Sequence, residues 1–200
     1  MKRSRNCIRV VKLGGSLLTR PDVDHRLADW LQFTATEGRA AIVVGGGQLI
    51  DVMRSFDQRW PLDAEAMHWR CVELLRYTME IIADRMPQLK SIRDVDGLDE
   101  WRRDADTSRD ALVDVNAFYR KEDADSRRLP SSWKTTTDSI AALLAFKLEA
   151  ESLTLLKSCS PPIDDDWVAA SRAGIVDDAF PEAIEGLSNV KIVDLTKSSC

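Results

Sequence analysis

The sequence lacks the residues on which several classes of protein depend. It contains four cysteines and two histidines, and no two cysteines form a CxxC pair. This argues against a structural zinc site and against a disulfide framework, and so indicates a reducing compartment. The longest apolar run, residues 140–146, is far too short to span a bilayer, and no apolar signal core follows the basic first five residues. We therefore expect a cytoplasmic protein with no membrane partner.

Excess positive charge is also absent. The chain has 28 Lys and Arg against 33 Asp and Glu, which gives a net charge of −5. This balance argues against a nucleic-acid partner, and an anionic substrate needs local positive groups to hold it. With 44% hydrophobic and 30% charged residues, the 200-residue chain has the composition of a globular protein. We expect one domain over residues 1–200.

Strand and helix patterns alternate along the chain. Apolar runs rich in β-branched residues predict strands at residues 8–12, 40–44, 89–92, 111–115, 153–156 and 190–195. Apolar residues at three- and four-residue steps predict helices at residues 24–36, 48–56, 63–85, 137–149 and 167–173. The polar stretches 94–109 and 120–128 are interpreted as loops or short solvated helices. This alternation predicts an α/β fold, a three-layer αβα sandwich with a largely parallel sheet that binds ligands at the carboxyl ends of its strands.

Two glycine clusters follow predicted buried strands. Lys12 is followed by Gly14, Gly15 and Ser16, and neither a Walker pattern nor GxGxxG is present. Glycines let backbone N–H groups approach a phosphate, and the lysine adds a full positive charge. The alternative is a tight turn that needs glycine only for its backbone angles. The same two interpretations apply to the second cluster, which comprises Gly45, Gly46 and Gly47.

A third segment, residues 133–139, leads into the predicted helix at 137–149. Its sequence, WKTTTDS, places Asp138 at the start of that helix. An Asp or Thr in this position is first of all a helix N-cap. The functional interpretation places Asp138 near the phosphate site, where a carboxylate orients Lys12 or a metal ion.

In these three segments the chain resembles the amino acid kinase family, which includes the carbamate, aspartate and uridylate kinases. The similarity runs from IRVVKLGGSLL at Ile8 through AIVVGGGQLID to TTTDSIAALLAFKLEAESLTLLK at Lys157. The order and spacing of the segments are more specific than any one motif. The resemblance implies an ATP-dependent phosphotransferase in which Lys12 contacts the transferred phosphoryl group and Asp138 organises that lysine. It further implies that Gly14, Gly15, Ser16, Lys157 and Ser158 hold the nucleotide, and that Gly45, Gly46, Gly47, Thr136 and Thr137 face the acceptor.

A nearer similarity is to a short branch of this family. The branch has a His–Trp pair in the middle helix and an LPxSW motif, which here are His68-Trp69 and the segment 129–133. Its members resemble the kinases of methanofuran and tetrahydromethanopterin cofactor biosynthesis. The resemblance implies MgATP as donor and a phosphate monoester, such as an aminomethylfuran-methyl phosphate, as small-molecule acceptor. It assigns no side chain as a metal ligand, and it implies a homodimer or higher homo-oligomer.

The chain departs from the family at two places. Many members carry a second lysine in a late GGMxxK segment, but residues 173–177 here read AGIVD. The VDG of the nucleotide loop is replaced by the segment 159–162, CSPP. Lys157 is the candidate for the second positive charge, and the alternative is an ordinary solvated lysine. The departures also motivate a non-catalytic nucleotide- or anion-binding protein as an alternative, and a uridylate-type kinase is a further one.

Two assignments at the acceptor end stay open. His68 lies on the broad apolar face of its helix, and it either faces the substrate or is simply packed there. A basic pair, Arg120-Lys121 or Arg127-Arg128, either holds an acceptor phosphate or belongs to a solvated loop.

Overall fold

A six-stranded parallel sheet forms the centre of the computed structural model, which describes residues 7–104, 109–122, 129–161 and 166–197. Every pair of neighbouring strands is parallel, and the strand order is β3-β4-β2-β1-β5-β6. The predicted α/β fold with a parallel central sheet is confirmed. The strands are β1 (Ile8–Leu13), β2 (Arg39–Val44), β3 (Lys90–Ile92), β4 (Ala111–Val113), β5 (Ser152–Lys157) and β6 (Val190–Asp194).

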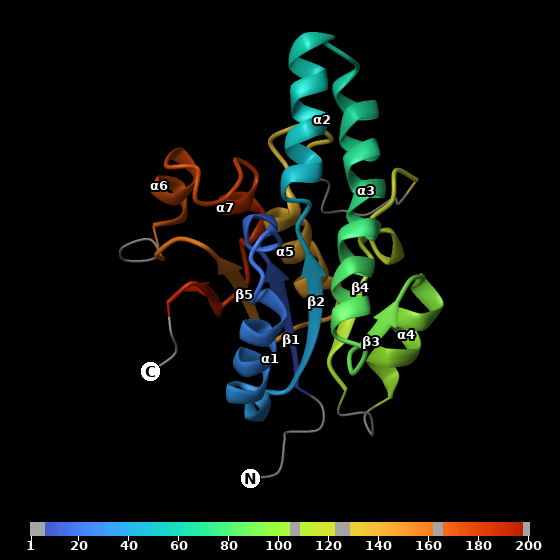
Figure 1. The fold of residues 1–200 in the computed structure, drawn as a ribbon, viewed down its shortest axis with the longest axis vertical. Coiled ribbons are helices and arrows are strands. Elements are labelled where there is room, and N and C mark those ends of the chain that lie inside the picture. The colour runs from blue at the N-terminus through green and yellow to red at the C-terminus, as the bar shows by residue number, and fades with distance from the viewer. Residues whose placement is uncertain (1–6, 105–108, 123–128, 162–165, 198–200) are drawn as a thin grey trace.

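Helices cover both faces of the sheet (Figure 1). The predicted helices form within a few residues of their expected bounds, and the first one ends early, at Phe33, where a single 3-10 turn continues to Glu37. The α-helices are α1 (Val23–Phe33), α2 (Gln48–Arg59), α3 (Ala64–Arg85), α4 (Val95–Arg103), α5 (Thr137–Lys147), α6 (Trp167–Arg172) and α7 (Phe180–Ala183).

The core lies on both sides of the sheet because side chains alternate along each strand. Val10 of β1 belongs to one apolar cluster, together with most of α5, and Val11 belongs to the other, together with α1. β1 and β2 are buried at every position, as expected for central strands covered on two faces. The helix α5 is buried from Thr137 to Ala145. This burial fixes Asp138, the second residue of α5, against the end of β1.

Two parts of the chain differ from the sequence prediction. The stretch 94–109, expected to be loop or solvated helix, contains α4, and its Leu98 and Trp101 are buried in the core. The short helix was one of the two alternatives expected, and the sequence did not reveal that Leu98 and Trp101, three positions apart, anchor it in the core. The helix α7 was not predicted, because its four residues are too few for a periodic pattern.

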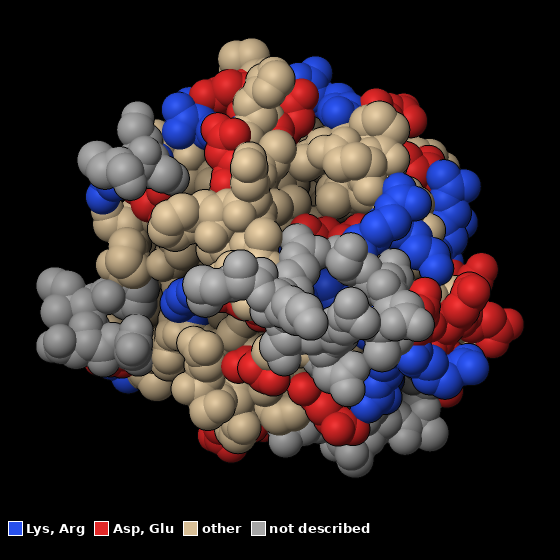
Figure 2. Space-filling model, turned by 90° about the horizontal axis from the view of Figure 1, so that it is seen from below, with Lys and Arg blue, Asp and Glu red and all other residues tan. Residues whose placement is uncertain are grey.

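The helices α2 and α3 rise past the carboxyl ends of the strands (Figure 1). None of the helices in the described residues is both long enough and apolar enough to cross a membrane. Figure 2 shows the molecule from below, at the opposite end of the sheet, where basic and acidic side chains are interspersed. The carboxyl ends of the strands, where both glycine turns lie, are therefore the place to look for a ligand site.

Candidate active site

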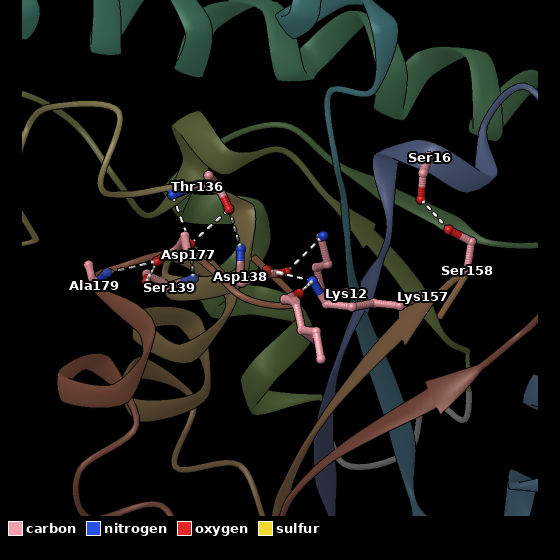
Figure 3. Close-up of polar contacts among 10 residues, drawn as sticks. Lys12, Ser16, Thr136, Asp138, Ser139, Lys157, Ser158, Asp177 and Ala179 are labelled. Atoms are coloured by element: carbon pink, nitrogen blue, oxygen red, sulfur yellow. Dashed lines mark hydrogen bonds and ion pairs between the residues drawn. The ribbon is translucent and has the colours of Figure 1, made fainter. Parts of the chain in front are cut away.

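Two lysines from neighbouring strands flank one buried carboxylate (Figure 3). Lys12 Nζ lies 2.8 Å from Asp138 Oδ1, and Lys157 Nζ lies 2.6 Å from Asp138 Oδ2. The side chains of Lys12, Asp138 and Lys157 are 7%, 5% and 12% exposed. β1 and β5 are adjacent and parallel, so their ends meet at one edge of the sheet, where α5 begins. The structure thus places the three residues predicted to be catalytic together.

The electrostatics of this group follow from burial and from its two opposite charges. Burial alone raises the pKa of Asp138, but the ammonium groups of Lys12 and Lys157 outweigh it and hold that pKa below its ordinary value. Burial and the nearby Lys12 ammonium lower the pKa of Lys157, although Asp138 opposes this shift. Lys157 Nζ also donates to the carbonyl oxygen of Ile175 at 2.6 Å. With both lysines charged, the group carries one net positive charge, which suits a phosphoryl group.

The two glycine turns touch each other through their main chains. A Cβ on Gly15 would lie 2.2 Å from the backbone nitrogen of Gly47, and one on Gly45 would lie 2.7 Å from that of Gly15. Gly47 also has a φ of +53°, which side chains other than glycine rarely adopt. Both clusters therefore require glycine for steric and backbone reasons alone.

The same turns also leave backbone donors available. The N–H groups of Gly14 and Gly45 are used, since each donates to a strand carbonyl at 2.8 Å. Within the described residues, the N–H groups of Gly15, Ser16 and Gly47 have no hydrogen-bond partner. Such donors beside a positive charge are what a phosphate requires. The structural and the functional interpretation of these glycines are thus compatible.

A contact between two serines joins the first glycine turn to the loop after β5. Ser16 Oγ and Ser158 Oγ lie 2.9 Å apart (Figure 3). The two residues were predicted to hold the nucleotide, and they come from segments that are 142 positions apart. The contact brings the two parts of the predicted nucleotide site to one place.

A cavity of about 590 Å³ opens beside these residues. Gly45 and Asp138 are not part of its lining, because one is packed against the neighbouring turn and the other is covered by the two lysines. The remaining predicted site residues line it: Lys12, Gly14, Gly15, Ser16, Gly46, Gly47, His68, Thr136, Thr137, Lys157 and Ser158.

Asp177 is an organising residue of the site that sequence reasoning did not identify. Its carboxylate accepts hydrogen bonds from Thr136 N at 2.8 Å, Thr136 Oγ1 at 2.7 Å and Ser139 N at 3.1 Å, and also from Ser139 Oγ (Figure 3). It also accepts a hydrogen bond from Ala179 N at 3.1 Å. Asp177 thereby fixes the first turn of α5, which carries Asp138. The only signal in the sequence is an acidic residue directly after the apolar GIV.

His68 is held by two hydrogen bonds in the wall of the cavity. Its Nδ1 lies 3.3 Å from the carbonyl oxygen of Ser132, which accepts only, so this nitrogen carries the proton. Its Nε2 then accepts from the hydroxyl of Tyr119 at 3.0 Å. Burial lowers the pKa of His68 and raises that of Tyr119 to about 12. His68 is therefore a neutral wall residue near neutral pH.

Of the two basic pairs considered as acceptor contacts, the structure describes Arg120-Lys121. Arg120 Nε donates to Asn116 O at 2.8 Å, and Lys121 Nζ pairs with Glu65 at 3.5 Å. Neither residue lines the cavity. Arg127 and Arg128 are outside the described residues. The alternative of a solvated loop position is favoured for Arg120 and Lys121.

Solved structures of kinases share this fold. Uridylate kinase from Archaeoglobus fulgidus is 17% identical, with a TM-score of 0.61 over 92% of this chain and 89% of that one. UMP kinase from Ureaplasma parvum is 14% identical, with a TM-score of 0.66 over 96% of this chain and 91% of that one. Aspartate kinase from Synechocystis is 14% identical, with a TM-score of 0.60 over 92% of this chain but 40% of its own. At these identities the likeness establishes the fold.

The sequence itself establishes the family. No curated protein matches it. The family model that does match is described as the amino acid kinase family, and it covers residues 8–161, from β1 past the end of β5. These residues include both glycine turns, Asp138 and Lys157, and they make up well over half of the chain. The chain belongs to the amino acid kinase family.

Proposed function

We propose that this protein transfers the γ-phosphoryl group of ATP to a small molecule that bears a phosphate monoester. The observation that carries the proposal is the group formed by Lys12, Asp138 and Lys157, which lies beside a cavity and two turns with available N–H groups. Membership of a kinase family supports the reaction type. The acceptor class rests on the resemblance to the short branch with the His–Trp pair and the LPxSW motif.

Each residue has a defined part in this reaction. The backbone N–H groups of Gly15 and Ser16 hold the phosphates of ATP, and Ser158 closes the site from the β5 side. Lys12 and Lys157 stabilise the charge that spreads over the transferred phosphoryl oxygens. Asp138 keeps the two ammonium groups apart and orients both.

The chemical step is an in-line displacement at phosphorus. An oxygen of the acceptor phosphate forms a bond to the γ-phosphorus, the bond from that phosphorus to the β–γ bridging oxygen breaks, and ADP leaves. A phosphate monoester is largely ionised at neutral pH, since its second pKa is about 6, so it needs no general base. The cavity wall agrees with this requirement, because burial lowers the pKa of its histidine, His68, and the Nε2 of that ring already accepts a hydrogen bond from Tyr119.

The described side chains do not form a protein cage for Mg²⁺. No group of three or more His, Cys, Asp or Glu residues among them is arranged to hold a metal ion, and both oxygens of Asp138 face ammonium groups. Mg²⁺ commonly binds through substrate phosphates and water. We therefore propose that it enters on ATP, where it neutralises phosphate charge.

The geometry of Lys157 favours the kinase over the non-catalytic alternative. That alternative was motivated by the missing lysine of the late segment. In its place, residue Ile175 of the same segment accepts a hydrogen bond from Lys157, and Lys157 brings its charge to Asp138. A second positive charge is thus available from β5.

A thermal unfolding scan with and without MgATP tests the donor half of the proposal. Ligand at about a hundred times its dissociation constant adds roughly 2.7 kcal/mol, which raises Tm by a few degrees in a domain of this size. We expect the shift in wild type and a smaller one in Lys12→Ala. Lys191→Ala is the matched control, because this partly exposed lysine of β6 pairs with Glu37. No shift in wild type at millimolar MgATP would contradict ATP as the donor.

Product analysis tests the acceptor half. The protein is incubated with γ-labelled ATP and either an aminomethylfuran-methyl phosphate or UMP, and labelled diphosphate product is separated from ATP. We expect product with the furan phosphate and none in Lys12→Ala. Product with UMP alone would instead establish the uridylate-type alternative, and ATP binding without any product would favour the non-catalytic one.

A further inference from the structure

Part of the cavity wall does not come from the strands that carry the two lysines. This region of the lining belongs to α2, to α3, to the segment before α5 and to the start of α5. Its walls include the apolar side chains of Val72, Leu75 and Ile140, which can accommodate a compact apolar body. A molecule in this region needs a polar anchor as well, because apolar contact alone does not fix orientation.

Arg54 offers such an anchor. Its guanidinium lies over the ring of Trp133, 4.6 Å from the ring centroid, and both residues line the cavity. The indole Nε1 of Trp133 donates to Asp57 Oδ2 at 2.7 Å, so the ring that supports Arg54 is itself held in place. Within the described residues the guanidinium has no ion pair and no hydrogen bond. A stacked guanidinium with unused donors is suited to two-pronged binding of a phosphate.

The other positive groups of the cavity are already engaged. Lys12 and Lys157 are paired with Asp138, and His68 contacts Ser132 and Tyr119 while burial lowers its pKa and keeps it neutral. Among the described residues, Arg54 is thus the cation of the lining that makes no ion pair and no hydrogen bond, although its guanidinium stacks on Trp133. The chain carries a net charge of −5, so a local cation decides whether an anion is attracted here.

We propose that Arg54 is the acceptor-specificity residue, and that it selects acceptors by binding their phosphate group. This inference rests on the proposed function and names the residue that makes the acceptor a phosphate monoester. Asp51, one turn earlier on α2, also lines the cavity, and its negative charge repels a bound phosphate. The attraction between Arg54 and the phosphate has to exceed this repulsion.

The test is a calorimetric titration of phenyl phosphate, a phosphate monoester with a compact apolar body, into protein saturated with a non-hydrolysable ATP analogue and Mg²⁺. The variants are Arg54→Ala, Arg54→Lys and Asp51→Asn. Lys121→Ala is the matched control, because the sequence left this basic residue open as an acceptor contact and it lies outside the cavity lining. The affinity for the ATP analogue is measured first in every variant.

We expect Arg54→Ala to weaken phenyl phosphate binding by about tenfold to a hundredfold, as for a hydrogen-bonded charge pair. Arg54→Lys keeps the positive charge but loses the paired N–H donors of the guanidinium, so it binds phenyl phosphate more tightly than Arg54→Ala and more weakly than wild type. Asp51→Asn strengthens binding, and Lys121→Ala leaves it unchanged. The ATP analogue binds equally in all variants.

Wild-type affinity in Arg54→Ala would overturn the inference, and so would weaker binding in Asp51→Asn. It also fails if wild type binds the ATP analogue but takes up no phenyl phosphate at millimolar concentration. A wild type that binds no ATP analogue would count against the proposed function itself, so the two failures are distinguishable.

Discussion

Lys157 has a lowered pKa because it is buried and lies near the Lys12 ammonium. The charged form is the one that stabilises a phosphoryl group. We therefore expect kcat/KM to fall on the alkaline side at a pH below the ordinary lysine value of 10.5. Lys157→Arg keeps a positive charge at every accessible pH, so this alkaline decline disappears while the maximal rate falls. A pH–rate profile of both proteins checks this prediction, and an unchanged alkaline limb in Lys157→Arg would contradict it.

Single residues differ in how far the sequence reveals them. Lys12 and Lys157 lie at or next to the ends of their strands, and parallel strands end at one edge, so their meeting with Asp138 could be anticipated. Asp177 could not be identified, because its role comes from contacts with residues 38 and 41 positions away. Arg54 was likewise missed, because its stacking partner, Trp133, belongs to a different segment of the cavity wall.

The first turn of α5 depends on a carboxylate from outside the helix. Asp177→Ala removes five hydrogen bonds, and we expect it to lower the free energy of unfolding by about 2 kcal/mol or more. Because this turn carries Asp138, kcat falls at least tenfold while KM for ATP changes little. Steady-state kinetics and denaturant unfolding measure the two effects.

Asp94→Ala separates the effect on Asp138 from a general loss of stability. Asp94 caps α4 through the N–H of Gly97 at 2.8 Å, on an element that does not line the cavity. We expect this variant to lose about 1 kcal/mol and to keep its kcat. Equal losses of kcat in Asp94→Ala and Asp177→Ala would show that activity merely follows stability.

The close contact between the glycine turns predicts that a larger residue at position 15 lowers stability. In Gly15→Ala the new Cβ would lie 2.2 Å from the backbone nitrogen of Gly47, so one turn has to move. We expect a loss of about 1–3 kcal/mol in the free energy of unfolding and weaker MgATP stabilisation. Gly97→Ala is the control, since its nearest neighbour is the end of a side chain at 3.2 Å and its change stays within about 1 kcal/mol. Thermal unfolding scans of both variants, with and without MgATP, measure these changes. Wild-type stability in Gly15→Ala would contradict the described contact.

At the scale of elements, long and strongly patterned segments were predictable and short ones were not. β1 and β2 were found from continuous apolar runs and glycine punctuation, and α5 from apolar residues at three- and four-residue steps. α7 was not predicted and α4 was only one of two alternatives, because their helical state depends on Phe180 and Trp101 reaching the core. Tertiary burial, which sequence periodicity does not report over a few residues, decided these two segments.

The stability of the whole molecule should depend on pH through His68. Burial holds its pKa below the ordinary value of 6.5, so on acidification the unfolded chain takes up a proton before the native one does. The stabilisation is fully present above pH 6.5 and decreases as the pH falls below it. His68→Gln removes this contribution, so its unfolding free energy falls less between pH 7 and pH 5. The exposed His25→Gln serves as control, and an equal slope in His68→Gln and wild type would contradict the prediction.

The backbone contact between the two glycine turns has a consequence for substrate binding. One turn is proposed to hold ATP and the other to face the acceptor, so a ligand that shifts one turn also shifts the other. The two ligands then bind interdependently, and linkage requires that each changes the affinity of the other by the same factor. The strength of the coupling between the two substrates would thus depend on the spacing of two glycine backbones.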